Sequence, residues 1–198
     1  MENSTFTHPQ ILVKMGILAM VVLTASLCDS SHKDVPRQVA AERNEVKFDS
    51  ANQQKAIEFL FYANDLSLEQ QQMGQLAARK SLNIDIQELG KTMADTYRKS
   101  LEDVVIIAKS KKIILPIALS DKAQMTYNQL NTLSLLEFNK AYCDTITRRH
   151  EDAVAYFQSV FTTSTDDVIR QTALRMLPHL RTHLDYAMKS QKKVEPMN

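Results

Sequence analysis

Glycine is scarce in this chain. The 198 residues include three glycines, Gly16, Gly74 and Gly90, and no tryptophan. A β-rich domain of this size needs more glycine for its tight turns. Leu, Ala, Lys, Gln and Glu are common, and these residues favour helices. The composition therefore predicts an all-α protein, with a length that suits one domain once a targeting segment is removed.

An excess of charge of one sign is also lacking. Lys and Arg total 24 and Asp and Glu total 23, so the formal net charge is +1. No basic stripe interleaved with aromatics is present, so we expect no nucleic-acid partner. The sequence has no Gly-rich phosphate loop, no Cys-x-x-Cys, no His-Glu-x-x-His and no Gly-x-Ser-x-Gly. The sequence therefore offers none of these motifs from which to assign an activity.

Residues 1–27 are typical of a signal for export. Lys14 precedes an apolar run of about 13 residues, a signal-peptide length, whereas a spanning helix needs about 20. The run ends in Leu-Thr-Ala-Ser-Leu before Cys28, which resembles a bacterial lipoprotein signal whose cysteine is lipidated. Leu27 stands where that signal normally has Gly, Ala or Ser, so cleavage with release and an uncleaved anchor remain alternatives. The sequence thus predicts a periplasm-facing protein of the bacterial envelope, held on the outer membrane through a lipid on Cys28.

The rest of the chain divides into three parts. Residues 28–49 are polar, contain Pro36 and show no apolar period, which predicts a flexible tether that reaches about 25 Å. Residues 50–193 carry apolar residues at alternating spacings of three and four, the pattern of packed helices. Residues 194–198 are a polar tail.

Residues that can cap a first helical turn indicate where helices begin. They are Ser50, Asn83, Ser120, Ser134 and Ser164. The pattern predicts an antiparallel four-helix bundle. Between the second and third long helices it predicts an apolar loop, residues 113–119, packed on one end of the bundle, and a short extra helix over residues 120–131.

Each long helix carries one polar residue in its apolar stripe, and these are Gln70, Tyr97, His150 and His183. Counted from the turns, they lie about 18 to 30 Å from the bundle ends, so we expect one polar layer. Four-helix bundles build metal sites this way, but a buried polar layer also fixes helix register without a ligand. We favour the second interpretation, a hydrogen-bonded polar core layer. A metal site on His150 and His183 and a small-molecule pocket remain open.

The charged neighbours of these positions are expected outside the layer. Arg149 lies next to His150 on the predicted solvent face, and Glu69 and Asp144 lie off the stripe. A dinuclear iron or manganese site needs bridging carboxylates, usually in Glu-x-x-His pairs, and this chain has no such pair. Cys143 has no histidine at helical spacing to activate its thiol, so we expect a small buried apolar residue.

Three segments resemble domain of unknown function 4142, a bacterial envelope family. They are Met73–Ala77, Phe138–Tyr142 with His150 eight residues on, and Leu177–Leu184. The resemblance covers about residues 53 to 190. It implies a ferritin-like bundle of exported proteins that are common as lipoproteins, and it implies no established reaction.

The resemblance also implies departures from the family pattern. Family members typically show glutamate where this chain has Gln70, and Asp-His where it has Thr96 and Tyr97, whereas His150 and His183 match. Two of the four polar positions therefore lack metal-ligand chemistry in this chain. We expect a non-enzymatic binding or structural module without a cofactor. The alternative is a ferritin-like metal-binding protein or oxidoreductase that holds iron, manganese or zinc on His150 and His183.

Overall fold

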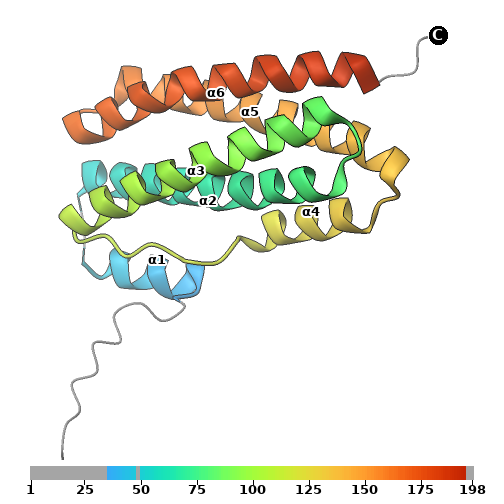
Figure 1. Ribbon diagram of the computed structural model, residues 1–198. Helices are drawn as coiled ribbons and strands as arrows, with labels where there is room; N and C mark the ends of the chain where they lie inside the picture. Colours follow the sequence, from blue (N-terminus) through green and yellow to red (C-terminus); the bar gives the residue numbers. More distant parts are fainter. Residues whose placement is uncertain (1–34, 48–49, 195–198) are drawn as a thin grey trace, which may run out of the picture. The chain divides into compact units, whose positions relative to one another are not determined.

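A computed structural model describes residues 35–47 and 50–194 (Figure 1). Within these residues the fold is all-helical and contains no strand. The helices are α1 (Arg37–Glu45), α2 (Ala51–Lys80), α3 (Ile84–Ser110), α4 (Asp121–Thr132), α5 (Leu135–Thr163) and α6 (Asp167–Val194). The predicted export signal, with Cys28, lies outside the described residues. Among the described helices, none combines the length and the apolar character needed to cross a membrane.

The helices begin where the sequence predicts, because the expected side chains cap them. Ser50 Oγ accepts a hydrogen bond from Gln53 N, and Gln53 Oε1 accepts one from Ser50 N, which completes a capping box. Ser134 does the same at α5, while Asn83 and Ser120 cap α3 and α4. At α6 the cap is Asp166, which lies within the predicted start at residues 164–167: its Oδ1 accepts from Val168 N at 3.0 Å.

The long helices pack as two hairpins, α2 on α3 and α5 on α6 (Figure 1). Large buried side chains join the hairpins. The Phe59 and Phe157 rings meet edge to face with centroids 5.1 Å apart, and Tyr142 Oη lies 3.5 Å from Met93 Sδ. Aromatic pairs of this geometry add about 0.5–1.5 kcal/mol beyond the area they bury. The space between the hairpins is thus the core of this helical bundle.

Two glycines let α2 and α3 approach closely. A Cβ atom on Gly74 would lie 2.5 Å from the Gly90 carbonyl oxygen and 2.8 Å from Ala94 N. A Cβ on Gly90 would lie 2.6 Å from the Gly74 carbonyl oxygen. Since these neighbours are backbone atoms, they cannot rotate away, and only glycine fits at this crossing. The close contact fixes the register of α2 against α3.

Helix α1 corrects one prediction. Residues 28–49 were expected to form a flexible tether, but residues 37–45 are helical and pack on the bundle. Ala40 and Asn44 are buried. The Asn44 amide nitrogen donates to the Ile114 carbonyl at 2.9 Å, and its oxygen accepts from Ile114 N at 3.0 Å. Long-range contacts with residue 114 therefore order a segment that has no apolar period of its own.

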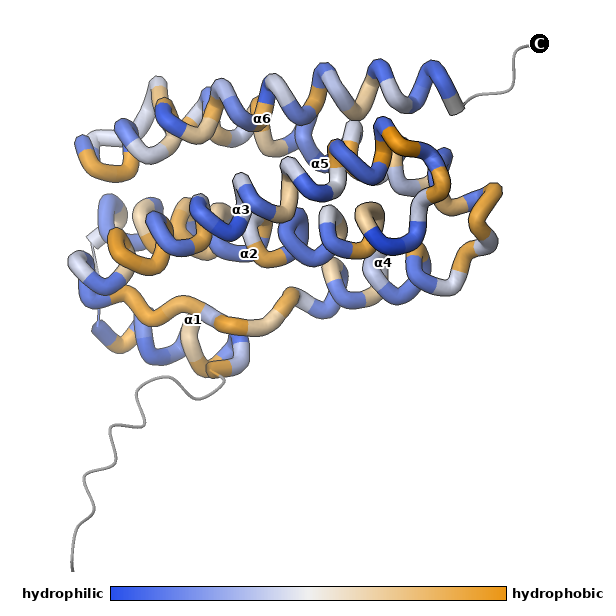
Figure 2. The backbone as a smooth tube through the Cα atoms, in the orientation of Figure 1, coloured by the Kyte–Doolittle hydropathy of each residue, from blue (hydrophilic) through white to orange (hydrophobic). Residues whose placement is uncertain are grey.

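The connection between α3 and α4 also differs from its prediction. This apolar stretch, orange in Figure 2, runs along α2 and does not pack across one end of the bundle. Asn64 Nδ2 donates to the Pro116 carbonyl at 2.9 Å, and Asp65 accepts from Ser120 N at 3.2 Å. The polar side chains Asn64 and Asp65 on α2 thus hold the backbone of the connection, which has no secondary structure to satisfy it.

Candidate functional site

Tyr97 on α3 and His150 on α5 meet in the core. Tyr97 Oη lies 2.8 Å from His150 Nε2, and His150 Nδ1 lies 2.8 Å from the Ile146 carbonyl oxygen. A carbonyl oxygen can only accept, so Nδ1 carries the proton and Nε2 accepts from the tyrosine hydroxyl. Both ring nitrogens of His150 are therefore used, and the imidazole is neutral.

The surroundings keep both groups uncharged. Tyr97 is 2% exposed and His150 is 0% exposed. Burial lowers the pKa of His150 to about 3, against the opposing hydrogen bond to Ile146, and repulsion from His183 and Arg149 lowers it further. Burial also raises the pKa of Tyr97 well above its usual value. At neutral pH the pair is a neutral donor and a neutral acceptor, with no charge to balance.

His183 on α6 joins this pair through ring contacts. Its centroid lies 5.5 Å from the Tyr97 ring and 5.6 Å from the His150 ring. The side chain is 4% exposed, and its Nδ1 has no hydrogen-bond partner in the described part of the chain. Burial lowers the pKa of His183 to about 4, and the charge of His179 lowers it further. His183 is thus a neutral imidazole with an unused nitrogen.

Gln70 on α2 is fully buried. Neither its Oε1 nor its Nε2 finds a hydrogen-bond partner among the described residues. Gly74 on α2 lies against Gly90 and Ala94 on α3. Because the two helices are antiparallel, one turn back along α2 from Gly74, to Gln70, corresponds to one turn forward along α3, to the level of Tyr97. The structure therefore brings Tyr97, His150 and His183 together, and it places Gln70 at the same level without a hydrogen bond to any of them.

Sequence reasoning missed an ion pair beside this layer, between a buried glutamate and a partly buried arginine. Arg149 Nε donates to Glu69 Oε2 at 2.6 Å, and Arg149 Nη1 donates to Tyr62 Oη at 3.4 Å. Glu69 is 5% exposed, and burial raises its pKa although the arginine opposes this shift. The prediction that Arg149 faces solvent is wrong, because the side chain turns back onto α2. The only sequence signal was that Glu69 and Arg149 directly precede Gln70 and His150.

Cys143 is buried beside the same core. Burial raises the pKa of its thiol to about 12, and it forms no disulfide within the described residues. A thiol with this pKa is protonated at neutral pH and is a poor nucleophile. The environment of Cys143 is that of a small apolar residue.

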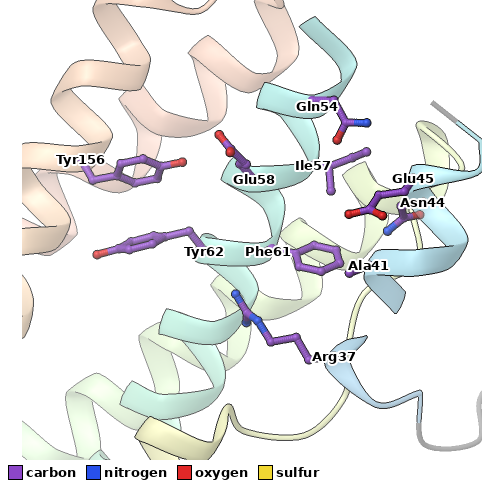
Figure 3. A pocket seen from close by; sticks show the side chains of 10 residues that line it. All are labelled: Arg37, Ala41, Asn44, Glu45, Gln54, Ile57, Glu58, Phe61, Tyr62 and Tyr156. Atoms are coloured by element: carbon purple, nitrogen blue, oxygen red, sulfur yellow. The ribbon is translucent and has the colours of Figure 1, made fainter. Parts of the chain in front are cut away.

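Two of the cavities on the surface have the volume of a small-molecule site, and none of the four layer residues lines either of them. The first, about 460 Å³, lies between α1, α2 and α5 (Figure 3). Tyr62 and Tyr156 stand side by side at one end of it, with Glu58 next to them. The second, about 500 Å³, lies between α3 and α6 and includes Thr96 and His179 in its walls. Both volumes fall in the range of small-molecule sites.

The polar layer does not have the ligands of a carboxylate-bridged metal centre. Over the described ranges no three His, Cys, Asp or Glu side chains lie close enough to surround an ion. The layer offers two imidazoles, one carboxamide and one phenol. Glu69, a buried carboxylate that directly precedes Gln70, forms an ion pair with Arg149. A dinuclear iron or manganese site therefore does not fit these residues.

Comparison with known proteins gives a family. The family model described as "Domain of unknown function (DUF4142)" matches residues 41–189. The chain belongs to this family. The match includes His150 and His183, and it begins inside α1, four residues before that helix ends. No curated protein and no solved structure matches the chain.

Proposed function

We propose that this DUF4142 protein is an exported, lipid-anchored protein of the bacterial envelope, and that it acts as a non-enzymatic binding or structural module. The apolar run before Cys28 supports export and anchoring to the membrane, which we take to be the outer membrane. The pairing of α2 with α3 and of α5 with α6 supports a ferritin-like arrangement of the four long helices. Membrane lipid is its proposed partner, and nucleic acid is not.

The Tyr97–His150 hydrogen bond carries the non-enzymatic part of the proposal. A catalytic or metal-binding histidine needs a nitrogen that is free to meet substrate or ion. His150 has none, because Tyr97 Oη and the Ile146 carbonyl take both. A satisfied buried pair of this kind links α3 to α5 at one height, so it specifies which residues of the two helices pack together.

Metal analysis tests this proposal. We expect protein purified without added metal to contain iron, manganese and zinc well below one ion per chain. We also expect His150→Gln to leave that content unchanged, because Tyr97 and Ile146 already use both nitrogens. Near-stoichiometric metal that disappears in His150→Gln would overturn the structural role of the pair.

Labelling with palmitate tests the anchor separately. Radiolabelled palmitate should enter the wild-type protein and should not enter Cys28→Ser. Cys143→Ser serves as the matched control, since the Cys143 thiol is buried and should accept no lipid. Equal labelling of wild type and Cys28→Ser would rule out lipidation at Cys28 and leave the remainder of the proposal standing.

A second candidate function is a ferritin-like metal-binding protein or oxidoreductase that uses His150 and His183. The unpartnered atoms of Gln70 and His183 favour it, because buried polar atoms without a partner are rare and invite a ligand. It requires Tyr97 to release His150 Nε2. Iron, manganese or zinc bound through both histidines in the metal analysis would establish this candidate.

A further inference from the structure

The histidines 179 and 183 lie four residues apart on α6, so they share one face of that helix. Side chains at this spacing have Cβ atoms about 5–6 Å apart. Helical side chains also lean toward the preceding turn, which directs the His183 ring toward the level of His179. Two imidazoles at this helical spacing can therefore meet the same small ion.

Neither imidazole is engaged in the way His150 is. His183 Nδ1 is buried and unpartnered within the described residues, although the ring is tilted against the Tyr97 ring with centroids 5.5 Å apart. His179 is exposed. Desolvated nitrogen without a donor or acceptor is unfavourable. A ligand that accepts the nitrogen lone pair removes this penalty.

A groove gives access to the pair. His179 lines the cavity of about 500 Å³ between α3 and α6, and His183 is one turn further along α6. Thr96, also in the groove wall, precedes Tyr97, whose ring contacts His183. His183 does not itself line the groove, but its contact with Tyr97 and its position one turn from His179 place it next to the groove, on the side of the polar layer. Asp95 and Asp103 line the same groove, as do Lys99 and Arg175, so its acidic and basic side chains are equal in number.

We propose that His179 and His183 bind a divalent transition-metal cation, best represented by Zn²⁺, beside the α3–α6 groove. Neutral imidazole suits zinc, and two histidines four residues apart on a helix face are a known zinc-binding arrangement. No third His, Cys, Asp or Glu completes the shell within the described part of the chain, so water fills the other positions. Such an open site binds weakly and exchanges its ion.

This inference goes beyond the proposed function and assigns the metal to a different pair of residues from His150 and His183. The experiment is a calorimetric titration of zinc chloride into the reduced full chain in detergent. All proteins carry His8→Ala and His32→Ala, which remove the two histidines outside the described residues. The variants are His179→Ala, which alters an exposed residue, and His150→Gln. Thr182→Ala, exposed on the same helix, is the control.

We expect one zinc site, weakened at least tenfold by His179→Ala and changed less than about twofold by His150→Gln or Thr182→Ala. Zinc should also shift the imidazole nitrogen NMR signals of His179 and His183 and leave those of His150 in place. Three results would overturn the inference: no binding at millimolar zinc, unchanged binding by His179→Ala, or loss of binding in His150→Gln. The first two leave the role of the Tyr97–His150 pair intact, whereas the third removes it.

Discussion

The polar layer has two unlike halves. Tyr97 and His150 satisfy each other and the Ile146 carbonyl, so their polar atoms are matched in the core. Gln70 and His183 lie in equally dry surroundings, yet three of their side-chain nitrogen and oxygen atoms have no partner among the described residues. All four residues lie on long helices, and the two halves differ in whether their polar atoms have hydrogen-bond partners.

This difference predicts that the matched half stabilises the fold, whereas the unmatched half has polar atoms that can bind water or an ion. A satisfied buried pair is expensive to disrupt, because removal of one member leaves the other desolvated and alone. An unsatisfied buried group lowers stability, because it has lost its hydrogen bonds to water, and it stays available to water or to an ion. Mutations in the two halves should therefore have opposite signs, and four measurements test that contrast.

The largest effect is expected for His150→Ala. The change leaves the Tyr97 hydroxyl without its acceptor and opens a cavity, so the free energy of unfolding should fall by about 2–4 kcal/mol. Urea denaturation measures the loss. Glu151→Ala, at the exposed neighbouring position, should change stability by less than about 0.5 kcal/mol. Equal effects of the two changes would mean that the pair does not hold the core.

The second prediction concerns the close contact between α2 and α3, which carry Gln70 and Tyr97. Gly74→Ala places a methyl group against backbone atoms of Gly90 and Ala94, so α2 and α3 must separate. We expect a loss of about 3 kcal/mol, the upper end for an overpacked core, because backbone cannot rotate away. Gln75→Ala, on the exposed face of the same turn, is the control for thermal unfolding. A Gly74→Ala protein as stable as wild type would show that the helices are not held at this spacing.

The third measurement uses pH. The folded His150 has a pKa near 3, lowered by burial, whereas an unfolded histidine has about 6.5. The unfolded chain therefore takes up a proton first as pH falls. Stability from this group is fully present above about pH 6.5 and is lost as pH falls through that value toward 3. Between pH 7 and pH 5 the loss is about 2 kcal/mol.

His150→Gln cannot titrate, so its stability should fall less steeply over that range. His183, whose folded pKa is about 4, adds the same slope to both proteins and does not affect their difference. Urea midpoints at several pH values measure the two curves. Parallel curves would mean that the pKa of His150 hardly changes on folding, and the matched half of the layer would lose its physical basis.

The smallest effect has the opposite sign. Gln70→Met keeps the shape of the side chain and removes two unpartnered polar atoms, so the free energy of unfolding should rise by about 1 kcal/mol. Gln75→Met, which is exposed, should leave the urea midpoint where it is. A Gln70→Met protein that is clearly less stable than wild type would show that the amide has a partner in solution.

Local signals explain how much of the fold the sequence predicts. Each cap at Ser50, Asn83, Ser120 and Ser134 is a short-range interaction between residues three apart, so it is readable from the chain alone. The four stripe positions are buried for the same reason, since helical periodicity decides which face turns inward. The family resemblance, found on separate segments, is confirmed over residues 41–189.

The features that escaped prediction are long-range. Helix α1 is ordered by Asn44, whose partner Ile114 is 70 residues away. The Glu69–Arg149 pair spans 80 residues, and nothing in the periodic pattern predicts that Arg149 turns toward α2. Gly74 and Gly90 did carry a signal, because glycine inside a helix is unfavourable by about 1 kcal/mol and needs a packing reason. Which glycines meet depends on a helix register that the sequence does not state.

Because α1 packs on the bundle, the segment that would link a lipidated Cys28 to the folded domain is shorter than the predicted tether. The first described residue is Val35, which packs on the core, and it lies seven residues after Cys28 in the sequence. Seven residues span at most about 25 Å. A lipid on Cys28 would then keep Val35 within about 25 Å of the lipid surface, a distance shorter than the thickness of one bilayer. The anchored protein would diffuse along the membrane surface, and a ligand in the periplasm would have to come close to that surface to bind.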